Sequence, residues 1–224
     1  MSSSEGEQRL VVALPSGASV DVSAAVTVAA DARALAVIAP GAGAAYDHPF
    51  LRGLADGLRD AHVSTVRINF PYREAGRRMP GPAAHAIATW VAAFAFAGTV
   101  TDLPVWAMGK SYGGRMASMA AAEGAITPAG LVYLGYPLHP PGDPAKLRAA
   151  HLPSIPMPQL FLSGTKDPFV DPHEQLEVAV ASCPSARIEW VEGGGHSFEV
   201  AGRRRAADAI GADLAPLVAQ FLMP

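Results

Sequence analysis

The feature that most constrains this chain is a regular alternation of short apolar segments with longer helical ones. The predicted strands are Arg9–Ala13, Val20–Val28, Ala34–Ile38, Val63–Phe70, Pro104–Met108, Leu131–Leu134, Gln159–Leu162 and Arg187–Val191. The predicted helices lie near His48–Ala61, Ala83–Ala97, Tyr112–Ala122, His173–Ala181 and Arg203–Phe221. This alternation predicts an α/β fold in which helices cover both faces of a mostly parallel central sheet.

The length of the chain and its Pro-rich segment limit how these elements are arranged. A chain of 224 residues suits one well-packed domain better than two. We therefore expect a single domain over residues 1–224, with an N-terminal β region in residues 1–30 and the main core in residues 34–224. The Pro-rich segment Pro137–Pro158 could form a short ordered excursion, but it is too short for a large lid domain. A site at the edge of the sheet should therefore be fairly open.

Composition argues against several classes of partner. The net charge of −3 is small, and the basic residues form no run except Arg203–Arg205, which argues against nucleic acid. The single cysteine, Cys183, cannot form an internal disulfide, and the start Met1–Gly6 lacks the pattern of a secretion signal. The apolar stretch Ala83–Gly98 is shorter than the roughly 20 residues of a membrane span and carries His85, so we expect a buried helix. The sequence thus predicts a cytoplasmic protein without a membrane partner.

A Gly-x-Ser-x-Gly motif lies where a strand is followed by a helix. Gly109-Lys110-Ser111-Tyr112-Gly113 comes directly after an apolar run and directly before an Ala/Met-rich helix. In a nucleophile elbow the serine occupies a strained turn, and small neighbours allow the strand and the helix to approach closely. The motif therefore predicts that Ser111 is a nucleophile. The alternative is a structural role, in which Ser111 only caps the helix that follows.

Two segments partly match nucleotide-binding motifs, but each lacks a glycine that its motif requires. Gly109-Lys110-Ser111 reproduces the end of a Walker phosphate loop, but Pro104 stands where that loop needs glycine. Lys110 is then expected to be only the variable residue before the nucleophile. Gly41-Ala42-Gly43 matches the start of a dinucleotide fingerprint, but Tyr46 occupies the third glycine position. The seven histidines lack metal-binding spacings, so the sequence implies neither a metal nor another cofactor.

A serine hydroxyl becomes a strong nucleophile when a nearby base accepts its proton, and that base is commonly a histidine. The glycine-rich loop Glu192–Phe198 follows the last predicted strand and can carry His196 back over the sheet edge. Phe198 could anchor this loop in the core. The order of serine, acid and histidine along the chain also matches a known triad order. These features predict that His196 is the base.

The acid that orients the histidine should follow the preceding strand. Asp167 is the first acid after Gln159–Leu162 and is the expected partner of His196. Asp171 competes with it, although its place before Pro172 also suits a turn or a helix cap. An oxyanion hole needs backbone amides, for which Tyr112 and Ala42 are the candidates.

Taken together, these motifs resemble a compact, dienelactone-hydrolase-like branch of the α/β-hydrolase superfamily. A similar domain occurs in a subunit of a vertebrate chromatin complex. The matching stretches are Pro40–Gly43, Asp47–Phe50, Asn69–Tyr72, Gly109–Arg115, Tyr136–Pro140, Gly164–Phe169 and Gly195–Phe198. The resemblance implies the α/β-hydrolase fold without a large lid. Pro40 stands where many relatives have histidine, which leaves the backbone donors in place.

The resemblance also bears on activity and on neighbours of the site. Dienelactone hydrolases proper use a cysteine nucleophile, so Ser111 argues against that activity. The substrate-binding candidates are Gly43, Asp47, His48 and Arg115. For Asp47 and His48 a helix start completed by Pro49 is an equal interpretation, and Arg115 could instead pair on the surface.

The leading functional hypothesis is a carboxylesterase-like serine hydrolase that acts on a small ester or acyl substrate through an acyl-enzyme on Ser111. Two alternatives stay open at this point. The first is a binding or scaffold protein that kept the fold without catalysis, because a fold alone does not imply a function. The second is an acyltransferase or perhydrolase that uses the same residues.

Overall fold

The computed structural model describes residues 5–223, and its strands form one eight-stranded sheet. The strands are β1 (Glu5–Ala13), β2 (Ser19–Thr27), β3 (Ala34–Ala39), β4 (Val63–Ile68), β5 (Val105–Lys110), β6 (Leu131–Leu134), β7 (Gln159–Gly164) and β8 (Ala186–Val191). They lie in the order β1-β2-β4-β3-β5-β6-β7-β8. Residues 1–4 and 224 of the expected domain lie outside the described residues, and so does most of the Met1–Gly6 segment, for which the sequence predicts no secretion signal.

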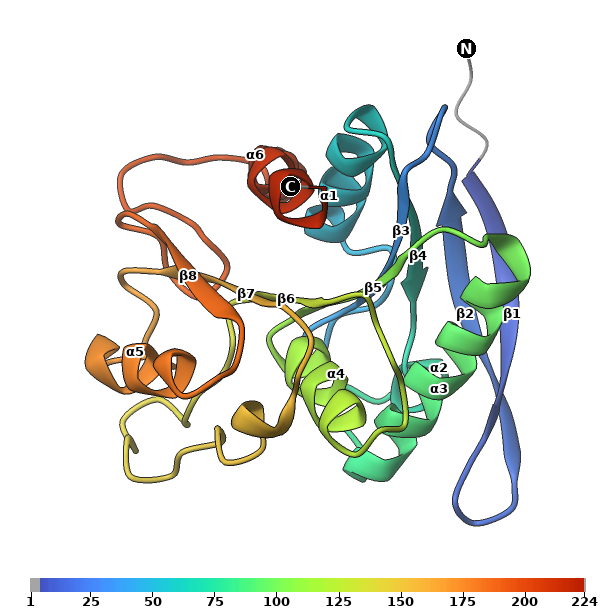
Figure 1. Cartoon of the computed structure of the whole chain (residues 1–224), viewed down its shortest axis with the longest axis horizontal. Helices are drawn as coiled ribbons and strands as arrows, with labels where there is room; N and C mark the ends of the chain where they lie inside the picture. The colour runs from blue at the N-terminus through green and yellow to red at the C-terminus, as the bar shows by residue number, and fades with distance from the viewer. Residues whose placement is uncertain (1–4, 224) are drawn as a thin grey trace.

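Six of the eight strands form parallel pairs with one another, and the antiparallel pairs are at the N-terminus. β1 pairs with β2, and β2 with β4, in antiparallel register. All pairs from β4 through β3 and β5 to β8 are parallel. The predicted N-terminal β region therefore extends the edge of the main sheet as a hairpin (Figure 1).

Helices cover both faces of the sheet, as predicted. They are α1 (Pro49–Asp60), α2 (Pro71–Glu74), α3 (Ala83–Val100), α4 (Tyr112–Ala122), α5 (His173–Ala181) and α6 (Ala207–Leu222). Figure 1 shows α1 and α6 together on one face, with α3, α4 and α5 on the other. The expected α/β class, with a mostly parallel sheet between two helical layers, is confirmed.

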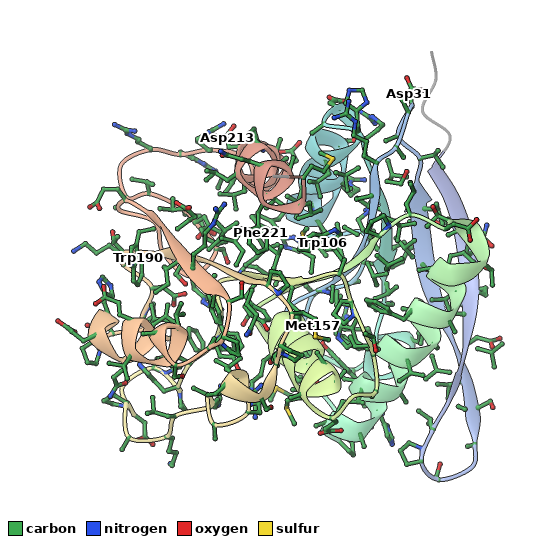
Figure 2. The ribbon with its side chains drawn as sticks, in the orientation of Figure 1. Asp31, Trp106, Met157, Trp190, Asp213 and Phe221 are labelled. Carbon is green, nitrogen blue, oxygen red and sulfur yellow. The ribbon has the colours of Figure 1, made fainter. Side chains whose placement is uncertain are left out.

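Each helical layer encloses its own hydrophobic core. Alternate residues of the strands point to opposite faces, so Ala36 and Ile38 pack toward α1 and α6, whereas Leu35 and Val37 pack toward α3 and α4. On the first face the ring of Phe221 in α6 meets the edge of Trp106 in β5, with centroids 5.5 Å apart (Figure 2). Burial of both strand faces explains why these strands are continuous apolar runs in the sequence.

The long segment between β6 and β7 forms a compact loop with one short 3₁₀ helix, η1 (Leu152–Ser154). It is tied down at its base, where the Tyr136 hydroxyl donates to the Arg148 carbonyl and the Arg148 amide donates to the Leu138 carbonyl. Within the described residues this excursion is far smaller than a lid domain, in agreement with the prediction.

Two helices differ from expectation. The last helix begins at Ala207 rather than Arg203, because the Arg203 amide donates to Val200 in a turn that keeps Arg203–Arg205 outside the helix. The helix α3 was expected to be buried, but only one of its faces is. The buried positions, Ala86, Thr89, Trp90, Ala93 and Ala97, recur at helical spacing and pack toward the sheet.

The composition of α3 also bears on location. Within the described part of the chain, α3 is long and apolar enough to span a membrane, with a mean hydropathy of 1.5 and 28% of its residues buried. This is weak evidence, because core helices of soluble proteins have the same composition. One face of α3 does pack in the hydrophobic core. The compartment itself stays a prediction.

Candidate active site

The site lies where the order of the strands changes direction. β3 has β4 on one side and β5 on the other, so the chain leaves β3 toward one edge of the sheet and later continues from β5 toward the other. Such a switch point opens a crevice at the carboxyl ends of the strands. A cavity of about 470 Å³ opens there, and both Ser111 and His196 line it.

Ser111 occupies a strained turn between β5 and α4. Its φ of 47° and ψ of −113° lie outside the regions that L-residues usually adopt. The turn is so tight that a Cβ on Gly113 would lie 2.6 Å from the Pro40 carbonyl oxygen, and a Cβ on Gly109 would collide with the Gly114 backbone. Glycine is therefore required at these two positions, and the strand-to-helix geometry expected from the motif is present.

Ser111, Asp167 and His196 come from three separate loops, and His196 lies between the other two residues. Its Nε2 is 2.8 Å from the Ser111 Oγ, and its Nδ1 is 2.8 Å from the Asp167 Oδ2. A carboxylate can only accept a hydrogen bond, so Nδ1 carries the imidazole proton and Nε2 presents its lone pair to the serine hydroxyl. This is the tautomer in which the histidine can accept the proton of Ser111.

The Asp167 carboxylate is buried and held from a second side. Its Oδ1 accepts a 2.9 Å hydrogen bond from the Phe169 amide, while its side chain has no solvent exposure. Asp171 is exposed, and none of the hydrogen bonds found within residues 5–223 joins it to His196. Of the two acids considered from the sequence, Asp167 is the one that the fold places against the imidazole.

Phe169 is a neighbour of the site that sequence reasoning missed. Its ring stacks on the His196 imidazole, with centroids 4.1 Å apart and an interplanar angle of 30°. It also forms part of the cavity wall. Its place two residues after the expected acid was the only sequence signal.

The loop that carries His196 is fixed at several points. The side chain of Phe198 is 3% exposed and stacks on Phe50, so it anchors the loop in the core as expected. Phe198 has a positive φ of 67°, a conformation that a bulky residue keeps only where its surroundings hold it. The Lys166 amide donates to the Gly194 carbonyl at 2.8 Å and joins this loop to the loop of Asp167.

Lys110 has a more specific place than the expected role of a variable residue. It is partly buried in the cavity wall, and its Nζ donates a 2.6 Å hydrogen bond to the His196 carbonyl oxygen. Burial lowers the pKa of Lys110 to about 8, although the nearby carboxylates of Asp167 and Glu199 oppose this shift. The contact depends on the path of a loop 86 residues away in sequence, which no local pattern reveals.

Of the two proposed oxyanion donors, Ala42 is part of the cavity wall, whereas Tyr112 directly follows Ser111 and is not part of that wall. Tyr112 is the first residue of α4, where helix amides have no partner within the helix. The Tyr112 ring packs against Phe70 and Tyr72. Burial raises the pKa of the Tyr112 phenol to about 12. Tyr112 is thus held by its ring while its amide remains at the helix start.

The other substrate-binding candidates divide into two groups. His48 lines the cavity and also caps α1, where its Nδ1 accepts a hydrogen bond from the Phe50 amide. Gly43, Asp47 and Arg115 are not in the cavity wall. The amide of Gly43 donates instead to the Tyr72 hydroxyl. Within residues 5–223, no group of three His, Cys, Asp or Glu side chains lies close enough together to hold a metal ion.

A family model described as an alpha/beta hydrolase domain matches residues 32–221. The chain belongs to this α/β-hydrolase family. The match covers the sheet from β3 onward and every loop of the candidate site. The superfamily expected from the motifs is therefore confirmed.

Solved structures share this α/β-hydrolase fold over nearly the whole chain. Dienelactone hydrolase from Anabaena variabilis is 21% identical, covers 98% of this chain and 97% of its own, and has a TM-score of 0.76. A lidless α/β serine hydrolase from Xanthomonas campestris is 18% identical, with coverages of 97% and 96% and a TM-score of 0.71. An α/β serine hydrolase homologue from Coxiella burnetii is 17% identical, with coverages of 96% and 97% and a TM-score of 0.70. The predicted likeness to a chromatin-complex subunit stays a prediction.

Proposed function

We propose that this α/β hydrolase is a serine esterase that cleaves a small carboxylic ester or related acyl compound through an acyl-enzyme on Ser111. The observation that carries the proposal is the hydrogen-bonded chain from Asp167 through His196 to Ser111. The chain ends at a cavity that a small molecule can enter. Its geometry supports a role for each member.

In the first step His196 acts as general base. Its unprotonated Nε2 accepts the proton of Ser111 as the hydroxyl oxygen attacks the ester carbonyl carbon. Asp167 keeps the other ring nitrogen protonated and stabilises the imidazolium that forms. The imidazolium then gives its proton to the departing alcohol, which leaves the acyl group on Ser111.

The developing oxyanion needs donors that are in place before the reaction starts. The amides of Tyr112 and Ala42 are the proposed pair, one from the start of α4 and the other from the loop after β3. Hydrolysis of the acyl-enzyme repeats the same steps, with water in place of Ser111 as the nucleophile. No cofactor is required for either half of this reaction.

The cavity supports a small substrate with an apolar part. Its wall includes the apolar side chains of Phe50, Leu51, Phe169, Ala207 and Ile210. The volume of about 470 Å³ lies within the usual range of small-molecule sites. An apolar wall favours an alkyl or aryl group on one side of the ester, because burying such a group in it is favourable.

A fluorophosphonate probe tests the proposal directly. It reacts with a serine only where the hydroxyl is activated and an oxyanion pocket is formed, so it should label the peptide that contains Ser111. Ser111→Ala should abolish both the label and the turnover of short-chain esters.

Ser118 provides a matched control. It is a buried serine on α4 whose Oγ lies 2.7 Å from the His151 Nε2, but its hydroxyl donates to the Arg115 carbonyl. His151 therefore donates to Ser118 and does not activate it. Ser118→Ala should keep the label and the activity. A folded wild-type protein that neither reacts with the probe nor turns over any ester in a panel of graded chain length would overturn the proposal.

A further inference from the structure

Lys110 connects the strand that carries Ser111 to the backbone of His196. It is the last residue of β5, directly before Ser111, and its Nζ donates to the His196 carbonyl oxygen at 2.6 Å. The histidine is therefore held at two levels, its ring by Asp167 and its backbone by Lys110. This second contact ties the base to the same strand end as the nucleophile.

Phe198 and Gly135 are neighbours of the Lys110 ammonium. The Nζ lies 5.7 Å from the centroid of the Phe198 ring, on the same loop as His196. A Cβ on Gly135 would lie 2.9 Å from the His196 carbonyl oxygen and 3.3 Å from the Nζ. Gly135 has a φ of 68°, so glycine at the end of β6 both permits the turn and leaves space for the lysine.

The charged groups that face the Lys110 ammonium are the carboxylates of Asp167 and Glu199, and His196 is the third titratable neighbour. Within the described residues Lys110 forms no salt bridge. Its hydrogen bond goes instead to the neutral carbonyl of His196. A partly buried ammonium that forms no salt bridge generally destabilises a fold. A contribution to stability therefore does not explain why a lysine is present at this position, whereas a functional role at the candidate active site does.

We propose that Lys110 is a positioning residue, which holds the backbone of His196 so that the imidazole stays within hydrogen-bond distance of Ser111. This inference rests on the proposed function of the same site. The hydrogen bond from Lys110 to the His196 carbonyl is strongest while the ammonium is charged, because a charge-assisted hydrogen bond is stronger than a neutral one. The enzyme should therefore lose activity on the alkaline side as Lys110 loses its proton near pH 8.

The test compares Lys110→Met with Lys166→Met. Lys166 also directly precedes one of the three aligned residues, but its side chain is exposed. Lys110→Met should lower kcat and the rate of fluorophosphonate labelling by about 10- to 100-fold, since small misplacements of reacting groups have effects of this size. KM should change by less than about threefold. Lys110→Met should also lose the decline of activity above pH 8, and Lys166→Met should behave as the wild type in every measurement.

Chemical rescue covers the case in which methionine disturbs the fold. In a Cys183→Ala background, Lys110→Cys can be alkylated to an aminoethyl side chain that restores the ammonium at nearly the same length. This product should regain labelling, whereas a neutral alkyl adduct of similar size should not. Rescue by both adducts would overturn the inference, because filling space would then be enough.

A readout independent of catalysis follows from the sequence, which has three lysines at positions 110, 146 and 166. Lysine-selective NMR should show one side chain that titrates near pH 8, and this signal should disappear in Lys110→Met. Unchanged labelling and turnover in folded Lys110→Met would overturn this inference alone. A wild type inert to the probe and to every ester would overturn the proposed function and this inference with it.

Discussion

The ring of Phe169 stacks on the imidazole of His196 while the amide of Phe169 binds the carboxylate of Asp167. One residue thus contacts two members of the aligned trio, through its side chain and through its backbone. A substitution at this position removes the ring contact and keeps the amide, so the two contributions can be separated.

Phe169→Ala is expected to lower kcat/KM by up to about tenfold. Aromatic pairs of this kind contribute roughly 0.5–1.5 kcal/mol beyond area burial, and about 1.4 kcal/mol corresponds to one factor of ten. The hydrogen bond from the residue 169 amide to Asp167 remains, so activity should fall without being abolished. Steady-state kinetics on a short-chain ester measure the effect. A loss above 1000-fold would mean that the backbone contact had also been broken.

Asp167→Asn is expected to lower kcat far more than Asp171→Asn. An asparagine amide can donate to Nδ1, which would leave the imidazole proton on Nε2, where it blocks acceptance from Ser111. The loss in the best-studied triad is about 10⁴-fold. Asp171 is exposed, so its substitution should leave kcat within about twofold of the wild type. The reverse order of effects would transfer the role to Asp171.

The Lys110 ammonium should also affect how stability depends on pH. In the folded protein its pKa is lowered to about 8 from the usual 10.5, so between these values the unfolded chain binds more protons than the folded one. The free energy of unfolding of the wild type should therefore rise from pH 8 to pH 10.5 relative to Lys110→Met, by on the order of 1–3 kcal/mol. Other titrating groups are common to both proteins and cancel in the difference.

Urea unfolding of both proteins at several pH values measures this difference. Below pH 8 Lys110→Met should be at least as stable as the wild type, because it removes a buried charge. A pH-independent difference between the two proteins would show that Lys110 titrates in the folded state as it does in the unfolded chain.

The sequence predicted the sheet and the aligned trio for the same reason. Parallel strands place their carboxyl ends at one edge, so residues that follow β5, β7 and β8 were expected to meet there, and Ser111, Asp167 and His196 do. The approximate positions of the central strands β3 to β7 were readable because these strands are buried on both faces. The prediction that α3 is fully buried was wrong, because the alanine-rich exposed face of this helix has the same hydropathy as a buried face.

The contacts of Lys110 and Phe169 could not be predicted in the same way. Each depends on where a loop backbone runs relative to a side chain from another strand, and residue type alone does not specify that path. The start of α6 was misplaced for a related reason, since a turn at Val200–Arg203 competes with the first helical turn. Local patterns thus predict the strand ends, whereas the contacts of Lys110 and Phe169 with the aligned trio are visible only in the folded structure.

The strained turn at Ser111 leads to a last prediction, in which stability and activity change in opposite directions. Ser111 has a φ of 47° and a ψ of −113°, and such conformations cost non-glycine residues of order 1–3 kcal/mol. Glycine adopts positive φ without a steric penalty, but it loses more backbone entropy on folding, by roughly 0.5–1 kcal/mol. Ser111→Gly should therefore stabilise the protein by a net of about 1 kcal/mol, which corresponds to a Tm higher by about 2–4 °C.

Ser111→Ala is the control for this prediction, because it removes the same hydroxyl and keeps the Cβ that causes the strain. Both variants should lose ester turnover and probe labelling, but only Ser111→Gly should gain stability over the wild type. Thermal unfolding of the three proteins at one pH measures the difference. Equal Tm values for the glycine and alanine variants would mean that the strain at Ser111 is no larger than the entropy cost of glycine, roughly 0.5–1 kcal/mol, and would contradict the prediction.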